Sequence, residues 1–137
     1  MRAAFTFHLL SPTPPAVAWS LVGDLAAVTE WVPGVTACTV DGDVRNCTFA
    51  DGRTVVERII DFDDTARSYG YSADTAGTPM TANSGSLAVA EASDGGSRVT
   101  WLAEVELVSD EAAEQMVPVL RSGYGAAFDQ LAERLRR

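Results

Sequence analysis

Basic residues are scarce in this sequence of 137 residues. It has 10 Lys and Arg residues against 19 Asp and Glu residues, which gives a formal net charge of −9. Nucleic-acid binding needs clustered Lys and Arg against the phosphates, and binding to anionic membrane surfaces needs them for the same reason. The shortage argues against both kinds of partner, and the acidic balance favours solubility.

Long apolar runs are also lacking, since none approaches the ~20 residues of a membrane helix. The N-terminal stretch MRAAFTFHLLSPTPPAVA has a short apolar segment that Thr6 and His8 interrupt, so it does not fit a signal peptide. We therefore expect a cytoplasmic protein that acts as a monomer or a homodimer. The only two cysteines, Cys38 and Cys47, are expected to be reduced in that compartment.

The motifs of metal, phosphate and dinucleotide sites are missing as well. No set of His, Cys, Asp and Glu has the spacing of a metal site, and there is neither a phosphate-binding loop nor a dinucleotide fingerprint. The single histidine, His8, alternates with Phe7 and Leu9 in a strand pattern, which places it on the opposite, outer face. We expect no metal and no cofactor.

The sequence does contain one strand pattern, a broken helix, six further strand patterns and a long helix. The first strand covers residues 3–10, and the helical stretch over 16–31 breaks near Gly23 and Asp24 into two short helices. Turn residues then separate six segments, at 35–40, 44–49, 53–62, 67–74, 84–92 and 97–108. Six strands at roughly ten-residue spacing indicate one antiparallel sheet.

The C-terminal segment 110–136 predicts a long helix, with Ser109 or Asp110 as its cap. Apolar residues repeat at intervals of four and three and form one face: Met116, Leu120, Tyr124, Ala127, Leu131 and Leu135. Gly123 and Ala127 are both expected to face the sheet. Their small side chains would either enlarge a space there or let the helix approach the sheet closely.

The chain length fits a single domain of the α+β class. A seven-stranded antiparallel sheet cannot bury a whole face under one helix unless it curls around that helix. Curling leaves space between the sheet and the helix, and the residues that face this space would decide the function.

Short motifs fall at fixed places in this order of elements: WVP after the short helices, VR on the third strand, ERIIDFDD on the fourth and VTW before the long helix. Together they resemble the START-like, or SRPBCC, superfamily, and most closely its bacterial polyketide cyclase/dehydratase branch. The resemblance covers essentially the whole chain, residues 1–137. It implies a single START-like ligand-binding domain with a helix-grip fold, and a cavity for a small hydrophobic molecule between the sheet and the long helix.

The stretch VVERII carries two charges, and only one of them can point inward. The resemblance implies that Glu57 faces the cavity, as the corresponding Glu does in the plant abscisic-acid receptors. Alternation then places Val55 and Ile59 inside with Glu57, and Arg58 outside. Glu57 would be an acid–base or ligand-binding group, or half of a structural ion pair with Arg45 on the neighbouring strand.

Residues of the third and fifth strands complete the expected site. Cys47 and Phe49 share a face with Arg45 and are expected to line the cavity. Tyr69 and Tyr71 share a face of the fifth strand. Tyr71 would donate a hydrogen bond to a ligand carbonyl or pack against a neighbouring strand.

The sixth and seventh strands offer further candidates. Ser84 and Ser86 share a face, where they would contact the ligand or lie on a solvated edge. Trp101 and Glu104 alternate onto opposite faces of the seventh strand, which is apolar enough on both faces for either to point inward. By the family pattern Glu104 is either a second pocket carboxylate or an exposed residue beside Glu106 without a role in the site. Leu120 is expected to line the cavity from the helix, with Gly123 and Ala127.

The two cysteines have a geometric relation of their own. If the hairpin turns on Gly42 and Asp43, Cys38 lies directly opposite Cys47. Such a pair would admit a cross-strand disulfide, but the expected compartment argues against one.

These residues allow three functions. In the first, Glu57 acts as a general acid or base in the cyclisation or dehydration of a polyketide-like carbonyl compound, with Tyr71 polarising a carbonyl and Arg45 assisting. In the second, the same site carries or senses a hydrophobic molecule without changing it. In the third, the fold has a structural or partner-binding role. A second polar group converging on Glu57 would favour the enzyme.

Overall fold

The structure is a computed structural model that describes residues 1–136. In chain order its elements are β1 (Arg2–Ser11), α1 (Pro15–Val22), the 3-10 helix η1 (Leu25–Glu30), β2 (Val35–Asp41), β3 (Val44–Phe49), β4 (Thr54–Asp63), β5 (Ser68–Ala73), β6 (Met80–Glu91), β7 (Ser97–Leu107) and α2 (Asp110–Leu135). The expected order of elements is confirmed.

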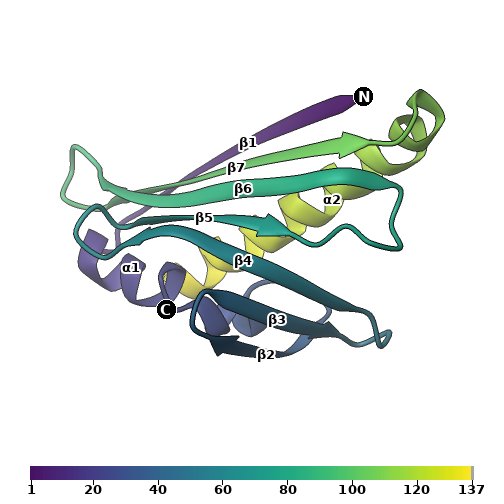
Figure 1. The fold of residues 1–137 in the computed structure, drawn as a ribbon. Helices are drawn as coiled ribbons and strands as arrows, with labels where there is room; N and C mark the ends of the chain where they lie inside the picture. Colours follow the sequence, from purple (N-terminus) through teal and green to yellow (C-terminus); the bar gives the residue numbers. More distant parts are fainter. Residues whose placement is uncertain (137) are drawn as a thin grey trace.

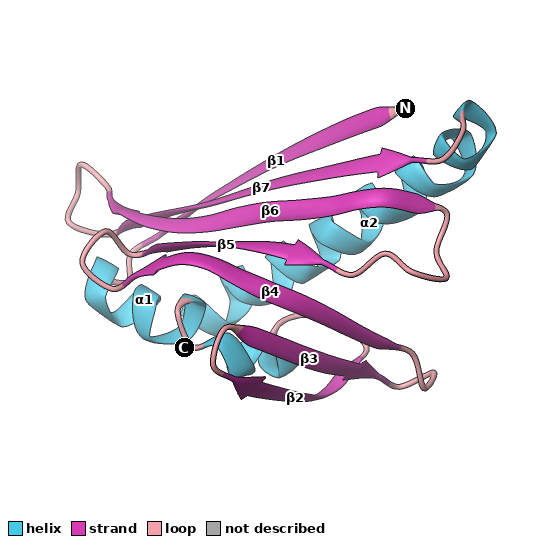
Figure 2. Ribbon diagram, viewed as in Figure 1, coloured by secondary structure: helices cyan, strands magenta, loops and turns pink. Residues whose placement is uncertain are grey.

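All seven strands form one antiparallel sheet in the order β1-β7-β6-β5-β4-β3-β2. Strands β2 to β7 follow one another as neighbours, and β1 joins the sheet beside β7. The sheet curves around α2, which crosses its concave face, while α1 and η1 lie near the C-terminal end of α2 (Figures 1 and 2). The predicted helix-grip architecture is therefore confirmed.

The break between the short helices has a local cause. α1 ends before Gly23, and the side chain of Asp24 then accepts a hydrogen bond from the backbone N–H of Ala26 at 3.3 Å, which caps η1. η1 packs beside β2 and carries Trp31 at its end, buried in the core. The WVP stretch thus sets an aromatic ring between the sheet and α2.

One strand boundary differs from its expected position. β6 begins at Met80, four residues before the expected start at Ser84. The residues over 80–83 have weak strand propensity, but they pair with the end of β7, Met80 with Leu107 and Asn83 with Val105. Pairing with β7 therefore extends β6 over residues 80–83, where the local sequence alone does not indicate a strand.

The hairpin of β2 and β3 turns on Gly42 and Asp43, as expected, with Gly42 at φ 60°. Cys38 lies directly opposite Cys47, and the structure joins the two in a disulfide. The expected reduced thiols are therefore not found. Two cysteines in a directly opposed cross-strand pair are close enough to bond, and the structure has them bonded.

α2 is anchored at its start by Ser109, whose side chain accepts a hydrogen bond from the N–H of Ala112 at 3.1 Å. Burial along the helix is uneven. The C-terminal half buries Ala127, Phe128, Leu131 and Leu135, whereas the N-terminal half buries only Ala113 among its apolar residues. Among the described helices, none combines the length and the apolar character that a membrane span requires.

Candidate functional site on the concave face

The concave face of the sheet is defined by residues that alternate inward on adjacent strands. Ile59 of β4, Tyr71 of β5, Gly85 of β6, Ala103 of β7 and Phe5 of β1 follow one another across the register. All but Gly85 are buried in the core. This row fixes which side of each strand faces α2, and the neighbouring inward positions follow by alternation.

Glu57 points to this concave side, as the resemblance implied, and it is paired. The Nε of Arg45 donates to Oε1 of Glu57 at 2.9 Å, across directly opposite positions of β3 and β4. The Arg45 side chain is 4% exposed and that of Glu57 is 14% exposed. The ion pair that was one of the two alternatives for Glu57 is therefore present.

The pair leaves part of the carboxylate available. No hydrogen bond to Oε2 of Glu57 is found in the part of the chain that the structure describes, and the side chain keeps some contact with solvent. An ionised carboxylate accepts several hydrogen bonds, so Oε2 can still bind a donor or take a proton. Arg45 neutralises and orients Glu57 but leaves Oε2 of its carboxylate available to a ligand.

Arg45 is itself held from three sides. Its Nη1 donates to the hydroxyl oxygen of Tyr69 at 3.3 Å and to the backbone carbonyl of Leu25 in η1 at 3.2 Å. Burial alone would lower the pKa of Arg45, but Tyr69 and Glu57 together outweigh it and raise that pKa. Burial likewise raises the pKa of the Tyr69 phenol. A charged guanidinium and a neutral phenol therefore stand beside Glu57.

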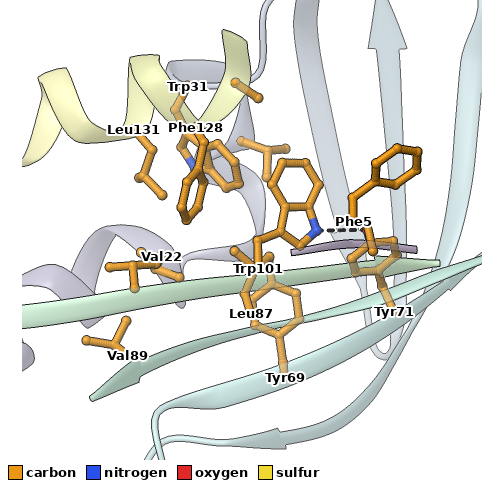
Figure 3. Close-up of a cluster of buried hydrophobic side chains, with 14 of the residues drawn as sticks. Phe5, Val22, Trp31, Tyr69, Tyr71, Leu87, Val89, Trp101, Phe128 and Leu131 are labelled. Atoms are coloured by element: carbon orange, nitrogen blue, oxygen red, sulfur yellow. Dashed lines mark hydrogen bonds between the residues drawn. The ribbon is translucent and has the colours of Figure 1, made fainter. Parts of the chain in front are cut away.

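Tyr71 lies one row from Glu57 and is held by Trp101. The indole Nε1 of Trp101 donates to the Tyr71 hydroxyl at 3.0 Å, and Figure 3 shows this bond as a dashed line. The phenol crosses over Gly85, where a Cβ would come within 2.5 Å of the Tyr71 oxygen. Glycine is thus required at this position so that Tyr71 reaches Trp101.

The hydroxyl of Tyr71 keeps its own proton. Burial is the main cause that raises its pKa far above the usual value, with smaller contributions from Tyr124 and Glu57. Since its oxygen accepts from Trp101, its O–H remains free to donate to a ligand. Trp101 faces inward, as Val105 does, which settles the orientation of β7.

Tyr124 of α2 also belongs to this group, and it was expected only as part of the apolar helix face. It packs against Trp101 at 4.9 Å and Phe5 at 5.5 Å between ring centroids. Burial first, and then the charge of Glu57, raise the pKa of its phenol to about 12. Its spacing on the helix face carried no sign of a polar role, because a tyrosine at an apolar position usually serves packing.

Three expected site residues lie on the other side of the sheet. Ser84, Ser86 and Glu104 line a shallow groove of about 490 Å³ on the outer, convex face. Glu104 is exposed and forms a loose ion pair with Arg2 at 3.8 Å. Their expected contact with an internal ligand is wrong, because Trp101 takes the inward side of β7 and alternation turns Glu104 outward.

The outer groove and the concave site lie on opposite faces of the same strands, and the backbone of the row from Tyr71 to Phe5 borders both. The groove is open and most of its lining side chains are small or solvated, whereas the buried charged and phenolic groups converge on the concave side. Binding of a polar ligand group or transfer of a proton requires such side chains. The concave face is therefore the candidate site.

The remaining residues that were expected to line the cavity differ in how deeply they are buried. Val55 and Phe49 are half-buried on the concave side, with Arg53 stacked over the Phe49 ring at 4.6 Å. Cys47 is buried there, but as a disulfide sulfur, which removes a free thiol from the site. Leu120 is half-buried on α2.

Ala127 and Gly123 behave differently from each other. Ala127 is buried, as expected. Gly123 is exposed, and a Cβ added there would meet no atom within 4 Å. Its expected inward position is therefore wrong, because it lies on the flank of α2 beside the apolar face rather than at the centre of that face.

The concave side has a packed half and an open half. The packed half contains aromatic and aliphatic side chains that fill the space under the C-terminal half of α2: Trp31, Trp101, Phe128 and Leu131 (Figure 3). Phe7 packs against Trp101 and Phe128 in the same half. The open half contains Arg45, Glu57 and Asn83, together with the N-terminal half of α2, whose inward residues Met116, Val117 and Leu120 stay half-buried. Two depressions of the described residues, the outer groove and a second one beside His8 and Arg98, lie away from the space between the sheet and α2.

Asn83 is the second residue that the sequence did not single out. Alternation with Gly85 and Leu87 turns it to the concave side. Its Oδ1 is buried, with no hydrogen-bond partner in the part of the chain that the structure describes. The strand was expected to begin at Ser84, so Asn83 fell in the loop before it.

No group of three or more His, Cys, Asp or Glu side chains within residues 1–136 is placed to hold a metal ion. The polar groups of the concave face are instead a carboxylate, a guanidinium, three phenols and an amide. Such a set can bind hydroxyl and carbonyl groups and move protons.

Comparison with known proteins gives a family and a set of similar structures. A model of the family described as polyketide cyclase / dehydrase and lipid transport matches residues 2–137. A search of curated proteins found no match. The structure resembles XoxI of Bacillus cereus, with 27% identity, a TM-score of 0.84 and coverage of 97% of this chain and 95% of that one.

Two further structures extend the comparison. A protein of Thermobifida fusca is 28% identical with a TM-score of 0.80, over 96% of this chain and 92% of that one. The Zhui aromatase/cyclase of a Streptomyces species is 13% identical with a TM-score of 0.83, over 98% of this chain and 94% of that one. At that identity the second likeness shows the fold alone.

Proposed function

Because the chain belongs to the polyketide cyclase / dehydrase and lipid transport family, we propose that its concave face binds a small hydrophobic, polyketide-like molecule and catalyses its cyclisation or dehydration. The observation that carries the proposal is the paired Glu57, whose Oε2 is free beside buried, protonated phenols. A carrier would need only an apolar surface there.

Each polar group has a part in this chemistry. Glu57 takes a proton from the carbon between two carbonyl groups of the substrate, and the resulting carbanion attacks another carbonyl carbon of the same molecule. A carbon–carbon bond forms, and the attacked oxygen becomes a hydroxyl with a proton returned from the site. In dehydration, that hydroxyl leaves as water with a second proton from the neighbouring carbon.

The other residues prepare this step. Arg45 holds the Glu57 carboxylate in place through its Nε, and η1 in turn holds Arg45 through Leu25. Tyr71, whose oxygen is fixed by Trp101, directs its O–H at the carbonyl oxygen on which negative charge develops. A tyrosine is protonated at neutral pH, and burial raises the pKa of Tyr71 further, so this donor keeps its proton beside a base.

The ligand would enter through the open half. There the inward residues of α2 and of the sheet remain half-exposed, so a hydrophobic molecule would cover apolar surface that now contacts water. The alternative function, a carrier or sensor of a hydrophobic molecule, would use the same surface and needs no proton transfer.

Substitution Glu57→Gln separates the two functions. It preserves shape and removes the charge, so it should lower the rate of cyclisation of a linear poly-β-ketone, followed by the absorbance of the aromatic product, by ~10²–10⁴-fold. The matched control is Glu104→Gln on the outer face, which should leave the rate unchanged. Equal rates for Glu57→Gln and the parent would remove Glu57 from the chemistry, and a parent that binds naphthol without any turnover would be a carrier.

A further inference from the structure

Asn83 carries a buried polar atom for which the fold has no evident use. Its Oδ1 lies out of contact with solvent and has no partner among the described residues, although its residue as a whole is half-buried. Leaving a buried acceptor unpaired is destabilising, so such groups are rare in native proteins.

The sheet register relates Asn83 to Glu57. Arg45 lies opposite Glu57, Glu57 lies opposite Ala73, and the pairing of Ser72 with Ser84 puts Asn83 next in the same row. Two inter-strand spacings separate the backbones of Glu57 and Asn83, about 10 Å. Ala73 stands between them on β5 and contributes only a methyl group to this row.

The row therefore presents two hydrogen-bond acceptors on either side of a short apolar gap. One is Oε2 of Glu57, which Arg45 leaves free, and the other is Oδ1 of Asn83. Beyond the gap, Val105 supplies a buried apolar floor on β7. Two acceptors over an apolar surface complement a flat hydrophobic molecule that carries a hydroxyl group at each end.

We propose that Asn83 determines the ligand specificity of the concave site, and that the ligand is a hydroxylated aromatic or enolic molecule with two separated hydroxyl groups, one donating to Glu57 and the other to Asn83. This inference rests on the proposed function, because it concerns the same site. Phenolic rings of this kind are also what cyclisation and dehydration of a poly-β-ketone produce, so product and intermediates would meet the same two acceptors.

Two probes test the specificity: a naphthalenediol with one hydroxyl on each ring, at the two ends of the molecule, and naphthol, which has a single hydroxyl. Titration calorimetry on the parent should show binding of both, with the diol tighter. Asn83→Leu should weaken diol binding about tenfold and change naphthol binding by less than about twofold, since a lost hydrogen bond of ~1.4 kcal/mol corresponds to a factor of ten.

The matched control is Asn46→Leu, the same exchange on β3 at an exposed position one residue from Arg45 in sequence and on the opposite face. It should alter neither affinity. The melting temperature of Asn83→Leu should not fall, because an apolar side chain of similar volume replaces an unpaired acceptor. Should that variant fail to fold, Asn83→Ala removes the carboxamide without adding bulk and should give the same selective loss.

Equal losses for diol and naphthol, or no loss for either, would overturn the role of Asn83 while leaving ligand binding at the concave face intact. A fall in melting temperature with an unchanged diol-to-naphthol ratio would identify Asn83 as a structural residue and also overturn the proposal. If the parent binds neither probe, the proposed function fails first, and the proposal for Asn83 fails with it.

Discussion

The packed half and the open half of the concave face belong to the same sheet and the same helix, yet they differ in the kind of side chains they contain and in how deeply these are buried. In the packed half, aromatic rings fill the space under α2 and Trp101 donates a hydrogen bond to Tyr71, while the buried Nε1 of Trp31 has no partner among the described residues. In the open half, an ion pair and an unpaired amide point to the concave side, and the apolar residues of the N-terminal half of α2 are only half-buried. One sheet would thus supply both stability and the proposed binding surface, because burial needs α2 close to the sheet and ligand access needs it farther away.

The packed half should carry most of the stability, and Trp101→Ala tests this with the largest expected effect. The substitution removes a buried indole that packs on Phe7, Tyr124 and Phe128 and also removes the donor to Tyr71. The free energy of unfolding, measured by denaturant titration, should fall by about 3–5 kcal/mol. The control Leu102→Ala, on the outer face of the same strand and 48% exposed, should cost well under half as much.

Substitutions in the open half should change the stability of the protein through the loss of an ion pair rather than through the loss of packing. Arg45→Leu leaves the Glu57 carboxylate beside a buried apolar side chain, which should cost about 2 kcal/mol, less than a fully buried pair because Glu57 keeps some contact with water. The double substitution Arg45→Leu with Glu57→Leu should recover much of that loss, since no unpaired charge remains.

Arg58→Leu is the matched control for the ion pair. Arg58 lies on the outer face of β4 and meets Asp43 at 3.7 Å with both side chains largely exposed, so its loss should change stability by less than about 1 kcal/mol. If Arg45→Leu proves no more costly than Arg58→Leu, the inner pair does not organise the open half, and the distinction between the two halves weakens.

The smallest effect is expected at Gly123, where substitution should raise the stability of the protein rather than lower it. A Cβ there meets nothing within 4 Å, and the backbone is helical, so Gly123→Ala should stabilise the protein by about 0.5–1 kcal/mol through helix propensity alone. Ala126→Gly, at another exposed position of α2, should cost a similar amount. A loss of stability in Gly123→Ala would show that α2 comes closer to the sheet in solution than its open half indicates.

Alternation along single strands was sufficient to predict part of the site. The inward position of Glu57, the shared face of Arg45 and Cys47, and the outward position of His8 follow from period-two patterns, because successive side chains of a strand point to opposite faces. The resemblance to the superfamily, now supported by the family match, supplied which of the two faces of β4 points inward.

The strand that is apolar on both faces could not be oriented in the same way. On β7, the sequence allowed either Trp101 or Glu104 to point inward, and the structure turns Trp101 to α2 and Glu104 to solvent. On β6, Ser84 and Ser86 alternate with the buried Leu87 and Val89, and they line the outer groove. Periodicity relates the residues of one strand to each other, but only packing against another layer decides which face is buried.

The sequence by itself determined the order of the elements, the antiparallel sheet, the long capped helix and the alternation that sets Glu57 beside Arg45, because these depend on local periodicity and turn chemistry. Only the tertiary structure decided that Asn83 belongs to a strand and that Tyr124 lies near the charge of Glu57. Asn83 becomes part of β6 through pairing with Val105, a partner 22 positions along the chain, and Tyr124 reaches the site because α2 crosses a curved sheet. Both relations join segments that are distant in sequence, so no local pattern records them.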